Sequence, residues 1–183
     1  MGKLFVISGA SGVGKSTVLS KVMAARPDLR FSVSATTRAP RAGETDGKDY
    51  YFVSKEMFLD MIEKNAFLEY DAHMDNYYGT PKAQLEEKLL SGSVILDIEP
   101  NGAFNVRREK ADAVLIFIAP PSLEELENRL RGRGDTSEEQ IKIRQARVAW
   151  EMEQSKQYDH VVINDVVENC ANKILEIIAR EAD

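Results

Sequence analysis

The strongest constraint on the fold of this chain is a glycine-rich octapeptide near its N-terminus. Residues 9–16 read GASGVGKS and match the pattern G-x-x-x-x-G-K-[ST] at every defined position. The short apolar run Leu4–Ile7 precedes the octapeptide and predicts a buried strand, and a helix is predicted from about Lys15 to Ala25. The octapeptide therefore has the strand, loop and helix context that a phosphate-binding loop requires.

The residue types of this loop suit a nucleoside triphosphate. Glycines let successive backbone N–H groups turn toward one anion, and the helix N-terminus adds partial positive charge. Lys15 can reach the β- and γ-phosphates, and the Ser16 hydroxyl can ligate Mg²⁺ directly. The residues expected to bind the triphosphate are Gly9, Ala10, Ser11, Gly12, Val13, Gly14, Lys15, Ser16 and Thr17.

Composition is that of an ordinary globular protein. The chain has 183 residues, of which 43% are hydrophobic and 30% charged, and this length suits one domain with a sizeable core. No run approaches the roughly 20 apolar residues of a membrane-spanning helix, and the first apolar run is too short for a signal peptide. A single cysteine and two histidines argue against disulfides and zinc sites. We expect a cytoplasmic protein with no membrane partner.

Charge is distributed unevenly. The net charge of −6 is the opposite of what proteins that bind nucleic-acid backbones usually carry. Arginines nevertheless gather in two places, with Arg38 and Arg41 in one and Arg129, Arg131 and Arg133 in the other. Local arginines on an acidic chain favour small anionic ligands, so we expect no nucleic-acid partner.

Strands and helices alternate over most of the chain, which predicts an α/β fold of three layers with a central parallel sheet covered on both faces. The expected strands lie at 4–7, 94–98, 114–118 and 161–163. The expected helices lie at 15–25, from Thr80-Pro81 to Gly92, at 100–109, from Ser122 to about 131, from Ser137 to about 156, and at 166–181.

Residues 32–80 interrupt this alternation. They carry short candidate strands at 31–34, 50–53, 67–72 and 76–78, and a candidate helix that Ser54 would cap. We therefore expect one domain with a core at 1–31 and 81–183, a small inserted α/β lobe at about 32–80, and a charged, glycine-rich lid at about 129–137.

Two further groups of residues suggest a second ligand. Arg38 and Arg41 could grip one phosphate from an extended segment, and Tyr50 and Tyr78 could donate hydrogen bonds to it. Asp97 and Glu99 end a predicted strand, where open α/β sheets place ligands. We expect Asp97 to be buried and to need a partner, either Mg²⁺ through water or a group of the phosphate loop.

The class of nucleotide-binding protein can be narrowed from the residues. A GTPase would need an Asn-Lys-x-Asp segment, but the one Asn-Lys pair, Asn172-Lys173, continues with Ile174 inside a predicted helix. The chain is also too short for an ATPase motor with additional arms. A small kinase is the leading interpretation.

Several segments together resemble the guanylate kinase family, over about residues 4–180. They are SGASGVGKST (8–17), FSVSATTRAPRAGETDGKDYYFV (31–53), FLEYDAHMDNYYGTP (67–81), SVILDIEPNG (93–102), PPSLEELENRLRGRG (120–134) and HVVIND (160–165). The block at 31–53 is the most specific. The resemblance implies Mg²⁺-dependent transfer of the ATP γ-phosphoryl group to GMP in purine nucleotide metabolism, and the sequence leaves acceptance of dGMP open.

The resemblance also implies roles for individual residues. The GMP site would comprise Ser34, Arg38, Arg41, Tyr50, Glu69, Tyr78, Thr80, Asp97 and Glu99. To the loop residues the ATP site would add Arg129, Arg133, Asn164 and Asp165, of which the last two would lie at the adenine. The catalytic residues would be Lys15, Arg38, Arg133 and Arg144. Mg²⁺ would be bound by Ser16 directly and by Asp97 through water.

The chemistry of guanine agrees with these roles. Guanine presents N1–H and the 2-amino group as adjacent donors and O6 as an acceptor. Glu69 could accept from both donors, and Ser34 or Thr80 could donate to O6. Adenine lacks this donor pair and would leave a buried Glu69 unpaired. The family usually carries aspartate where this chain has Glu99, whose side chain is one methylene longer.

Two alternatives remain at this point. One is a guanylate-kinase-like module that binds peptides without catalysis, although such modules usually have damaged phosphate loops and this loop is intact. The other is a kinase for a different nucleoside monophosphate. Since no apolar surface stripe is evident, we expect a monomer.

Overall fold

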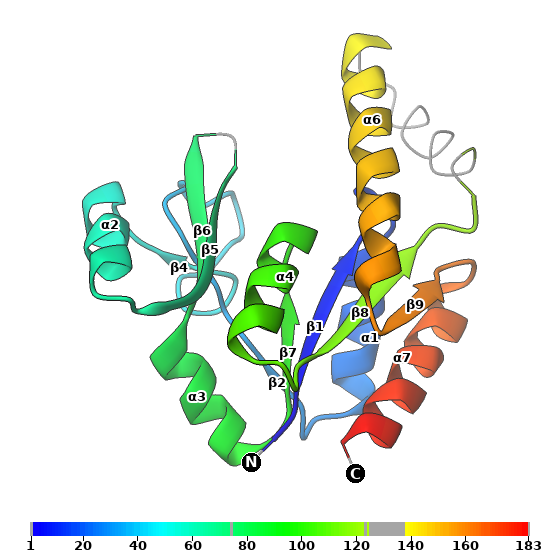
Figure 1. Ribbon diagram of the computed structural model, residues 1–183, viewed down its shortest axis with the longest axis horizontal. Helices are drawn as coiled ribbons and strands as arrows, with labels where there is room; N and C mark the ends of the chain where they lie inside the picture. Colours follow the sequence, from blue (N-terminus) through cyan, green and yellow to red (C-terminus); the bar gives the residue numbers. More distant parts are fainter. Residues whose placement is uncertain (1, 74, 123, 125–137, 183) are drawn as a thin grey trace. The chain divides into compact units, whose positions relative to one another are not determined.

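The computed structural model describes residues 2–73, 75–122, 124 and 138–182 (Figure 1). Its strands are β1 (Leu4–Gly9), β2 (Arg30–Phe31), β3 (Ala35–Thr36), β4 (Tyr51–Phe52), β5 (Phe67–His73), β6 (Asn76–Pro81), β7 (Val94–Asp97), β8 (Val114–Ala119) and β9 (His160–Ile163). Its helices are α1 (Lys15–Ala25), α2 (Lys55–Glu63), α3 (Lys82–Ser91), α4 (Pro100–Glu109), α6 (Glu138–Gln154) and α7 (Val167–Glu181), with a short 3₁₀ helix at Ser155–Gln157.

A sheet of five strands forms the centre of the fold, in the order β2-β7-β1-β8-β9. The β2–β7 and β8–β9 pairs are parallel. β1 and β8 are buried along their whole length, as expected of parallel strands covered on both faces. The predicted central parallel sheet is therefore confirmed.

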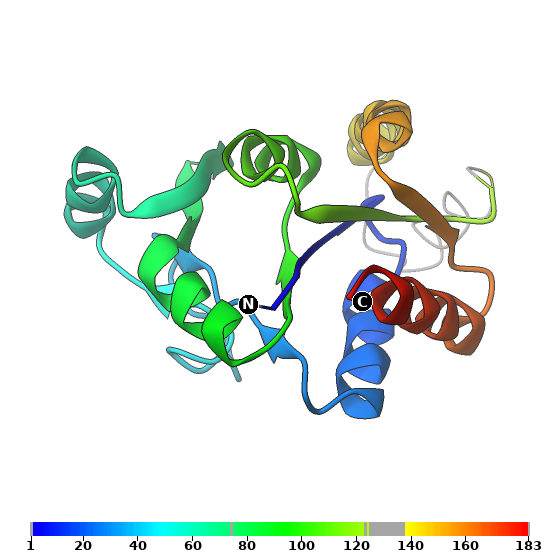
Figure 2. The same ribbon diagram turned by 60° about the horizontal axis from the view of Figure 1, so that its bottom comes forward.

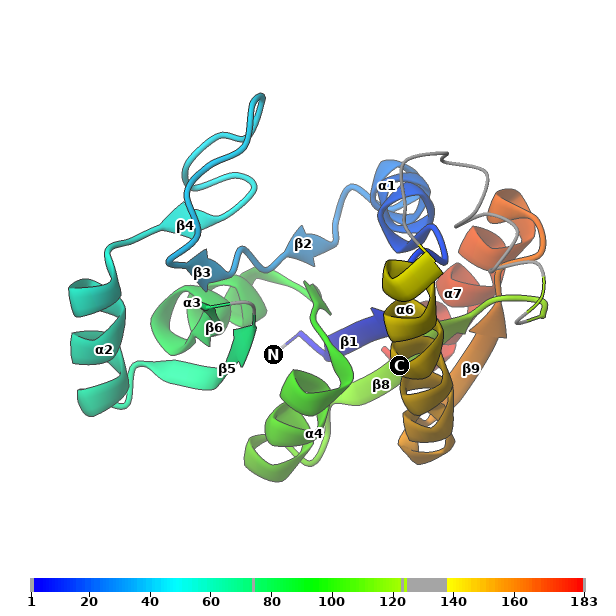
Figure 3. The same ribbon diagram turned by 90° about the horizontal axis from the view of Figure 1, so that it is seen from above.

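A second sheet of four strands, in the order β4-β3-β6-β5, is built from residues 35–81. Its longest part is the antiparallel β5–β6 hairpin, in which Glu69 lies opposite Thr80. α2 lies beside this sheet (Figure 3). It packs there through Phe58, whose ring stacks on Phe67 at 4.3 Å and on Tyr77 at 5.4 Å between ring centroids. Ser54 caps α2 as predicted, because its side chain accepts a hydrogen bond from the Met57 N–H.

The chain divides into two compact units. The first comprises residues 1–5 and 28–113, and the second comprises residues 6–27 and 114–183. In the second unit, α1 and α7 pack against each other on one face of β8 and β9, and α6 covers the other face (Figure 2). No helix of the described residues is long and apolar enough to cross a membrane.

Two predicted elements differ from the structure. The strand expected at 31–34 is instead two short strands in different sheets, because the chain leaves the central sheet after Phe31 and enters the second sheet at Ala35. Thr80 does not cap α3: it lies within β6, paired with β5, and Pro81 takes the N-cap position. The helix predicted from Ser122 to about 131 and the lid predicted at 129–137 lie almost wholly outside the described residues.

Candidate active site

The phosphate loop connects β1 to α1 as the sequence predicted. Gly14 takes the N-cap position of α1 with φ of 92°, a left-handed conformation that strains any residue with a side chain. Gly14 has no side chain with which to cap the helix, and the helix N-terminus carries the partial positive charge that attracts an anion. Lys15 and Ser16 are the first two residues of α1, with Lys15 half-buried and Ser16 exposed.

Three neighbouring elements hold the backbone of this loop. The Ala10 N–H donates to the Ile118 carbonyl of β8 at 3.2 Å. The Ser11 N–H donates to Glu151 Oε2 of α6 at 2.8 Å. The Asn164 side-chain amide donates to the Val13 carbonyl at 2.8 Å. The loop is thus fixed by its surroundings as well as by its own turns.

Asn164, which was expected at the adenine, lies against the phosphate loop through its side chain. The residue is 3% exposed and directly follows β9, while the neighbouring Asp165 is exposed. Glu151 was not found from the sequence. α6 carries several carboxylates, and its local sequence does not indicate which of them contacts the loop. Glu151 is 140 residues away in the sequence from Ser11, its partner there.

The Arg38 guanidinium forms a bidentate ion pair with Glu44, a residue that was also not found from the sequence. Its two terminal nitrogens donate to the two oxygens of Glu44, at 3.0 and 2.9 Å, and the Arg41 N–H donates to Glu44 Oε2 at 2.7 Å. The hydrogen bond from Arg38 is the largest cause that lowers the pKa of Glu44. Glu44 thereby links the side chain of Arg38 to the backbone of Arg41. These are the two arginines that were predicted to bind one phosphate.

Aromatic rings complete this cluster. The Arg38 guanidinium lies 5.4 Å from the centroid of the Tyr50 ring, and the Tyr50 and Tyr78 rings meet edge to face at 6.1 Å. A hydrogen bond to Tyr78 contributes to the raised pKa of Arg38, after that to Glu44. Three of the four predicted phosphate ligands therefore lie together, and Arg41 joins them through its backbone while its side chain is exposed.

Glu69 is the buried carboxylate of this unit, with 6% of its surface exposed. Burial raises its pKa to about 7, and the hydrogen bond from Thr80 acts in the opposite direction. Thr80 Oγ1 donates to Glu69 Oε1 at 2.5 Å. Gly102 of α4 approaches the other oxygen so closely that a β-carbon there would lie 2.7 Å from Glu69 Oε2. The carboxylate is held between β6 and α4, with its position set on both sides.

The remaining predicted ligands of the GMP site are less enclosed. Ser34 is half-buried immediately before β3. Glu99 is exposed and takes the N-cap position of α4 without a side-chain cap. Asp97, the last residue of β7, was predicted to be buried and is instead half-buried, because it stands at the end of the strand where the apolar cover stops.

Ser16 is the residue of the phosphate loop that fits Mg²⁺. Its hydroxyl is exposed in the first turn of α1, and a hydroxyl supplemented by phosphate oxygens and water is a usual magnesium environment. No cluster of three or more metal-ligating side chains occurs in the part of the chain that the structure describes. An ion here would depend on the bound nucleotide.

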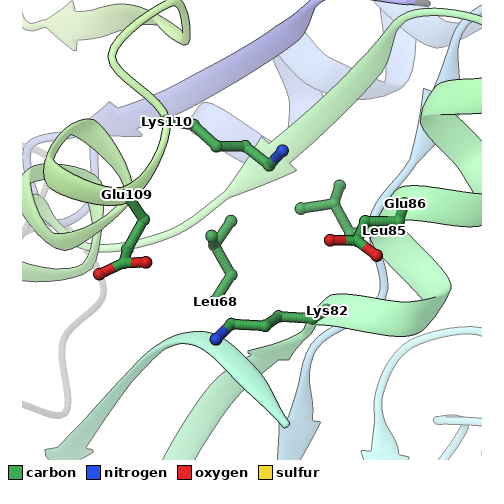
Figure 4. A pocket seen from close by; sticks show the side chains of 6 residues that line it. All are labelled: Leu68, Lys82, Leu85, Glu86, Glu109 and Lys110. Atoms are coloured by element: carbon green, nitrogen blue, oxygen red, sulfur yellow. The ribbon is translucent and has the colours of Figure 1, made fainter. Parts of the chain in front are cut away.

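Arg129 and Arg133 lie outside the described residues, and for Arg144 only the backbone, within α6, is described. One hollow of about 220 Å³ belongs to the first unit (Figure 4). Its lining carries two lysines and two glutamates and includes none of the predicted nucleotide ligands. The lining residues are Leu68, Lys82, Leu85, Glu86, Glu109 and Lys110.

A phosphate loop on a parallel α/β sheet, with a separate small sheet that carries paired arginines, tyrosines and a buried carboxylate, defines the class of P-loop nucleoside monophosphate kinases. Comparison with known proteins narrows the class. The family model "Guanylate kinase" matches residues 1–181. A guanylate kinase of Thermus thermophilus is 47% identical, and the match covers 98% of this chain and 82% of that protein.

Other relatives agree. The guanylate kinase of Caldanaerobacter subterraneus is 48% identical, and the match covers 98% of this chain and 88% of that protein. The crystal structure of guanylate kinase from Anaplasma phagocytophilum superposes with a TM-score of 0.80 at 34% identity, covering 99% of this chain and 86% of that one. The chain belongs to the guanylate kinase family, whose members are ATP:GMP phosphotransferases.

Proposed function

We propose that this protein transfers the γ-phosphoryl group of ATP to GMP in a Mg²⁺-dependent reaction that yields ADP and GDP. The observation that carries the choice of GMP is Glu69, a buried acceptor in the second sheet with no cationic partner among the causes of its raised pKa. Two adjacent donors on guanine, N1–H and the 2-amino group, would satisfy its oxygens. The intact phosphate loop and family membership support ATP as the donor.

On the ATP side, the backbone of the loop would cradle the β- and γ-phosphates, and Lys15 would follow the charge that develops on the transferred group. Ser16 would hold Mg²⁺ directly, and Asp97 would reach it through water. Bound Mg²⁺ would supply charge neutralisation between the β- and γ-phosphates. Asp165 and Asn164 would border the adenine, with Asn164 acting from its place against the loop.

On the GMP side, Arg38, Arg41, Tyr50 and Tyr78 would bind the phosphate. No general base is needed, because the GMP phosphate is itself an anionic nucleophile, and catalysis then depends on position and charge. When the phosphate arrives, Arg38 would turn part of its guanidinium from Glu44 to the ligand. Glu44 would keep Arg38 and Arg41 in the same relative position before and after GMP binds.

Recognition of the base would be divided among three side chains. Glu69 would accept from N1–H and the 2-amino group of guanine. The Thr80 proton is already directed to Glu69, so Ser34 is the better donor to O6. Glu99 would assist at the edge of the base from its exposed position.

The remaining parts of the proposal concern closure and context. Residues 32–80 would act as the GMP-binding lobe and residues 129–137 as a lid, which together would exclude water during transfer. Arg129, Arg133 and Arg144 would stabilise the phosphates of ATP and the group in transit. We further propose a cytoplasmic monomer of purine nucleotide metabolism that binds no nucleic acid or membrane.

The test is ADP release measured with MgATP and each of GMP, dGMP, AMP, UMP and dTMP. We expect turnover with GMP that exceeds turnover with AMP, UMP and dTMP by at least about a hundredfold. Preference for another monophosphate would identify a different kinase. No ADP release with any of them, from a protein that binds GMP, would favour the non-catalytic module.

A further inference from the structure

Two carboxylates are buried among the residues that the structure describes, Glu69 and Glu151. A buried ionisable group costs free energy unless its environment compensates it, so each such group needs a reason. For Glu69 the reason is the proposed recognition of guanine. Glu151 has no role in the proposed reaction, yet it is only 1% exposed and lies against the phosphate loop.

Each oxygen of the Glu151 carboxylate has a partner. Oε2 accepts the Ser11 N–H of the phosphate loop at 2.8 Å, and Oε1 accepts Arg147 Nε, one turn earlier on α6, at 3.0 Å. The Arg147 side chain is a third exposed. The carboxylate therefore bridges α6 and the loop.

The charge of Glu151 cannot serve phosphate binding directly. A negative group beside a site for ATP phosphates repels them, and Arg147 offsets that repulsion. What the contact provides is geometric. It turns the Ser11 N–H toward α6, and so fixes the orientation of the peptide group between Ala10 and Ser11 in a loop whose glycines would otherwise allow many conformations.

We propose that Glu151 is a positioning residue for ATP. Through Ser11 it holds the phosphate loop in its binding conformation, and Arg147 compensates its charge. The contact also ties the loop to α6, whose backbone includes residue 144 two turns before Glu151. The inference rests on the proposed function insofar as ATP is the ligand of the loop.

The experiment uses four variants of the full chain. Glu151→Ala removes both contacts. Glu151→Gln keeps an oxygen that can accept the Ser11 N–H but removes the charge. Arg147→Met removes the guanidinium that pairs with Glu151 Oε1. Glu153→Ala, at an exposed position of the same helix paired with Lys156, is the matched control. Calorimetric titration gives the Kd of MgATP and of GMP separately, well below the Tm of each variant.

We expect Glu151→Ala to raise the Kd of MgATP at least about tenfold while the Kd of GMP changes by less than about twofold. Glu151→Gln should restore affinity to within about threefold of the wild type, and Glu153→Ala should match the wild type. Arg147→Met should weaken MgATP binding, and adding Glu151→Gln to it should recover much of the loss, because the negative charge that Arg147 pairs with is then gone.

A purely structural role would give another pattern. If a folded Glu151→Ala bound MgATP as the wild type does, or lost MgATP and GMP affinity equally, the inference would be wrong. If Glu151→Ala does not fold, the comparison of Arg147→Met with the double variant Arg147→Met/Glu151→Gln decides. A double variant that binds MgATP no more tightly than Arg147→Met would overturn the inference. Turnover of the wild type with GMP is measured separately, so failure of the proposed reaction is distinguishable from failure of this inference.

Discussion

Thr80 directs its hydroxyl proton to Glu69, with Oγ1 and Oε1 2.5 Å apart, across the β5–β6 hairpin in which the two residues lie opposite each other. The contact gives a buried carboxylate one fixed donor and leaves its other oxygen beside Gly102. A guanine base would meet an acceptor whose orientation is already set, so less ordering is required on binding.

The first prediction follows from the pKa of Glu69, which burial raises to about 7 from an ordinary 4.5. Below about pH 4.5 the group is protonated in both folded and unfolded states; above about pH 7 it is ionised in both, and the folded state carries the cost. Ionisation of Glu69 therefore destabilises the fold. The free energy of unfolding of the wild type minus that of Glu69→Gln should fall from pH 5 to pH 8, by up to about 3 kcal/mol.

Denaturant titration of both proteins without nucleotide, at several pH values, measures this difference. Glu69→Gln is its own control, because every other titrating group is shared. A difference that stays constant from pH 5 to pH 8 would show that Glu69 titrates at its ordinary pKa.

The second prediction concerns Thr80. The Thr80 hydroxyl lowers the pKa of Glu69, so Thr80→Val should raise that pKa further and misplace the carboxylate. We expect the Kd of GMP at pH 7 to rise about fivefold to twentyfold, with the Kd of MgATP unchanged. Thr80→Ser keeps the hydroxyl and should bind GMP nearly as the wild type does. Equal losses in Thr80→Val and Thr80→Ser would point to lost packing instead.

Sequence-based prediction was accurate for features that neighbouring residues in the sequence determine. It was less accurate for features that depend on contacts between residues far apart in the sequence. α1 was predicted with its observed bounds because a loop motif and a following proline fix it locally. Thr80 was misassigned as a helix cap because its type and the following proline favour a cap, while its true place depends on pairing with Glu69. A local preference was overridden by a contact between strands.

The same reasoning explains what was missed in the candidate site. Resemblance to a family supplied the residues that we propose bind the substrates, whereas Glu44 and Glu151 contact those residues and carry no role that the resemblance implies. Glu44 is six residues from Arg38, and Glu151 is 140 residues from Ser11. Neither spacing has a periodicity or motif that singles out one carboxylate among the 30 acidic residues of the chain.

The third prediction tests Glu44 as the organiser of the two arginines. Glu44→Ala removes the shared acceptor of the Arg38 side chain and the Arg41 N–H. The substitution also removes a negative charge near the GMP phosphate, which by itself would favour binding. We expect the lost ordering of Arg38 and Arg41 to have the larger effect. The KM for GMP should therefore rise about tenfold, and the KM for ATP should stay within about twofold. Steady-state kinetics against each substrate gives both constants. A lower KM for GMP would show that Glu44 competes with the phosphate instead of organising its ligands.

The fourth prediction concerns Lys15, at the start of α1. Lys15→Met removes the point charge proposed to follow the transferred phosphoryl group, and kcat should fall at least about a hundredfold, or about 3 kcal/mol of transition-state stabilisation. The Kd of GMP should not change. A variant that keeps a third of wild-type turnover would contradict the role of the loop in phosphoryl transfer.

The fifth prediction separates the two glutamates proposed to meet guanine. Glu69 is buried, with one oxygen bound by Thr80 and the other close to Gly102, whereas Glu99 is exposed at the N-cap of α4. A fixed, desolvated acceptor discriminates strongly between bases, because the wrong base leaves it unpaired; an exposed side chain can turn to water instead. Discrimination against AMP should therefore reside mainly in Glu69.

Glu69→Gln presents an NH₂ donor where guanine also donates, so kcat/KM for GMP should fall at least about tenfold, or about 1.4 kcal/mol, and the preference over AMP should shrink. Glu99→Asp keeps the charge and shortens the side chain, and the same constant should move less than about threefold. Both variants are assayed with GMP and AMP at one magnesium concentration. If Glu99→Asp proved the more damaging change, the exposed carboxylate would have to close over the base on binding, and Glu99 would be the principal reader of guanine.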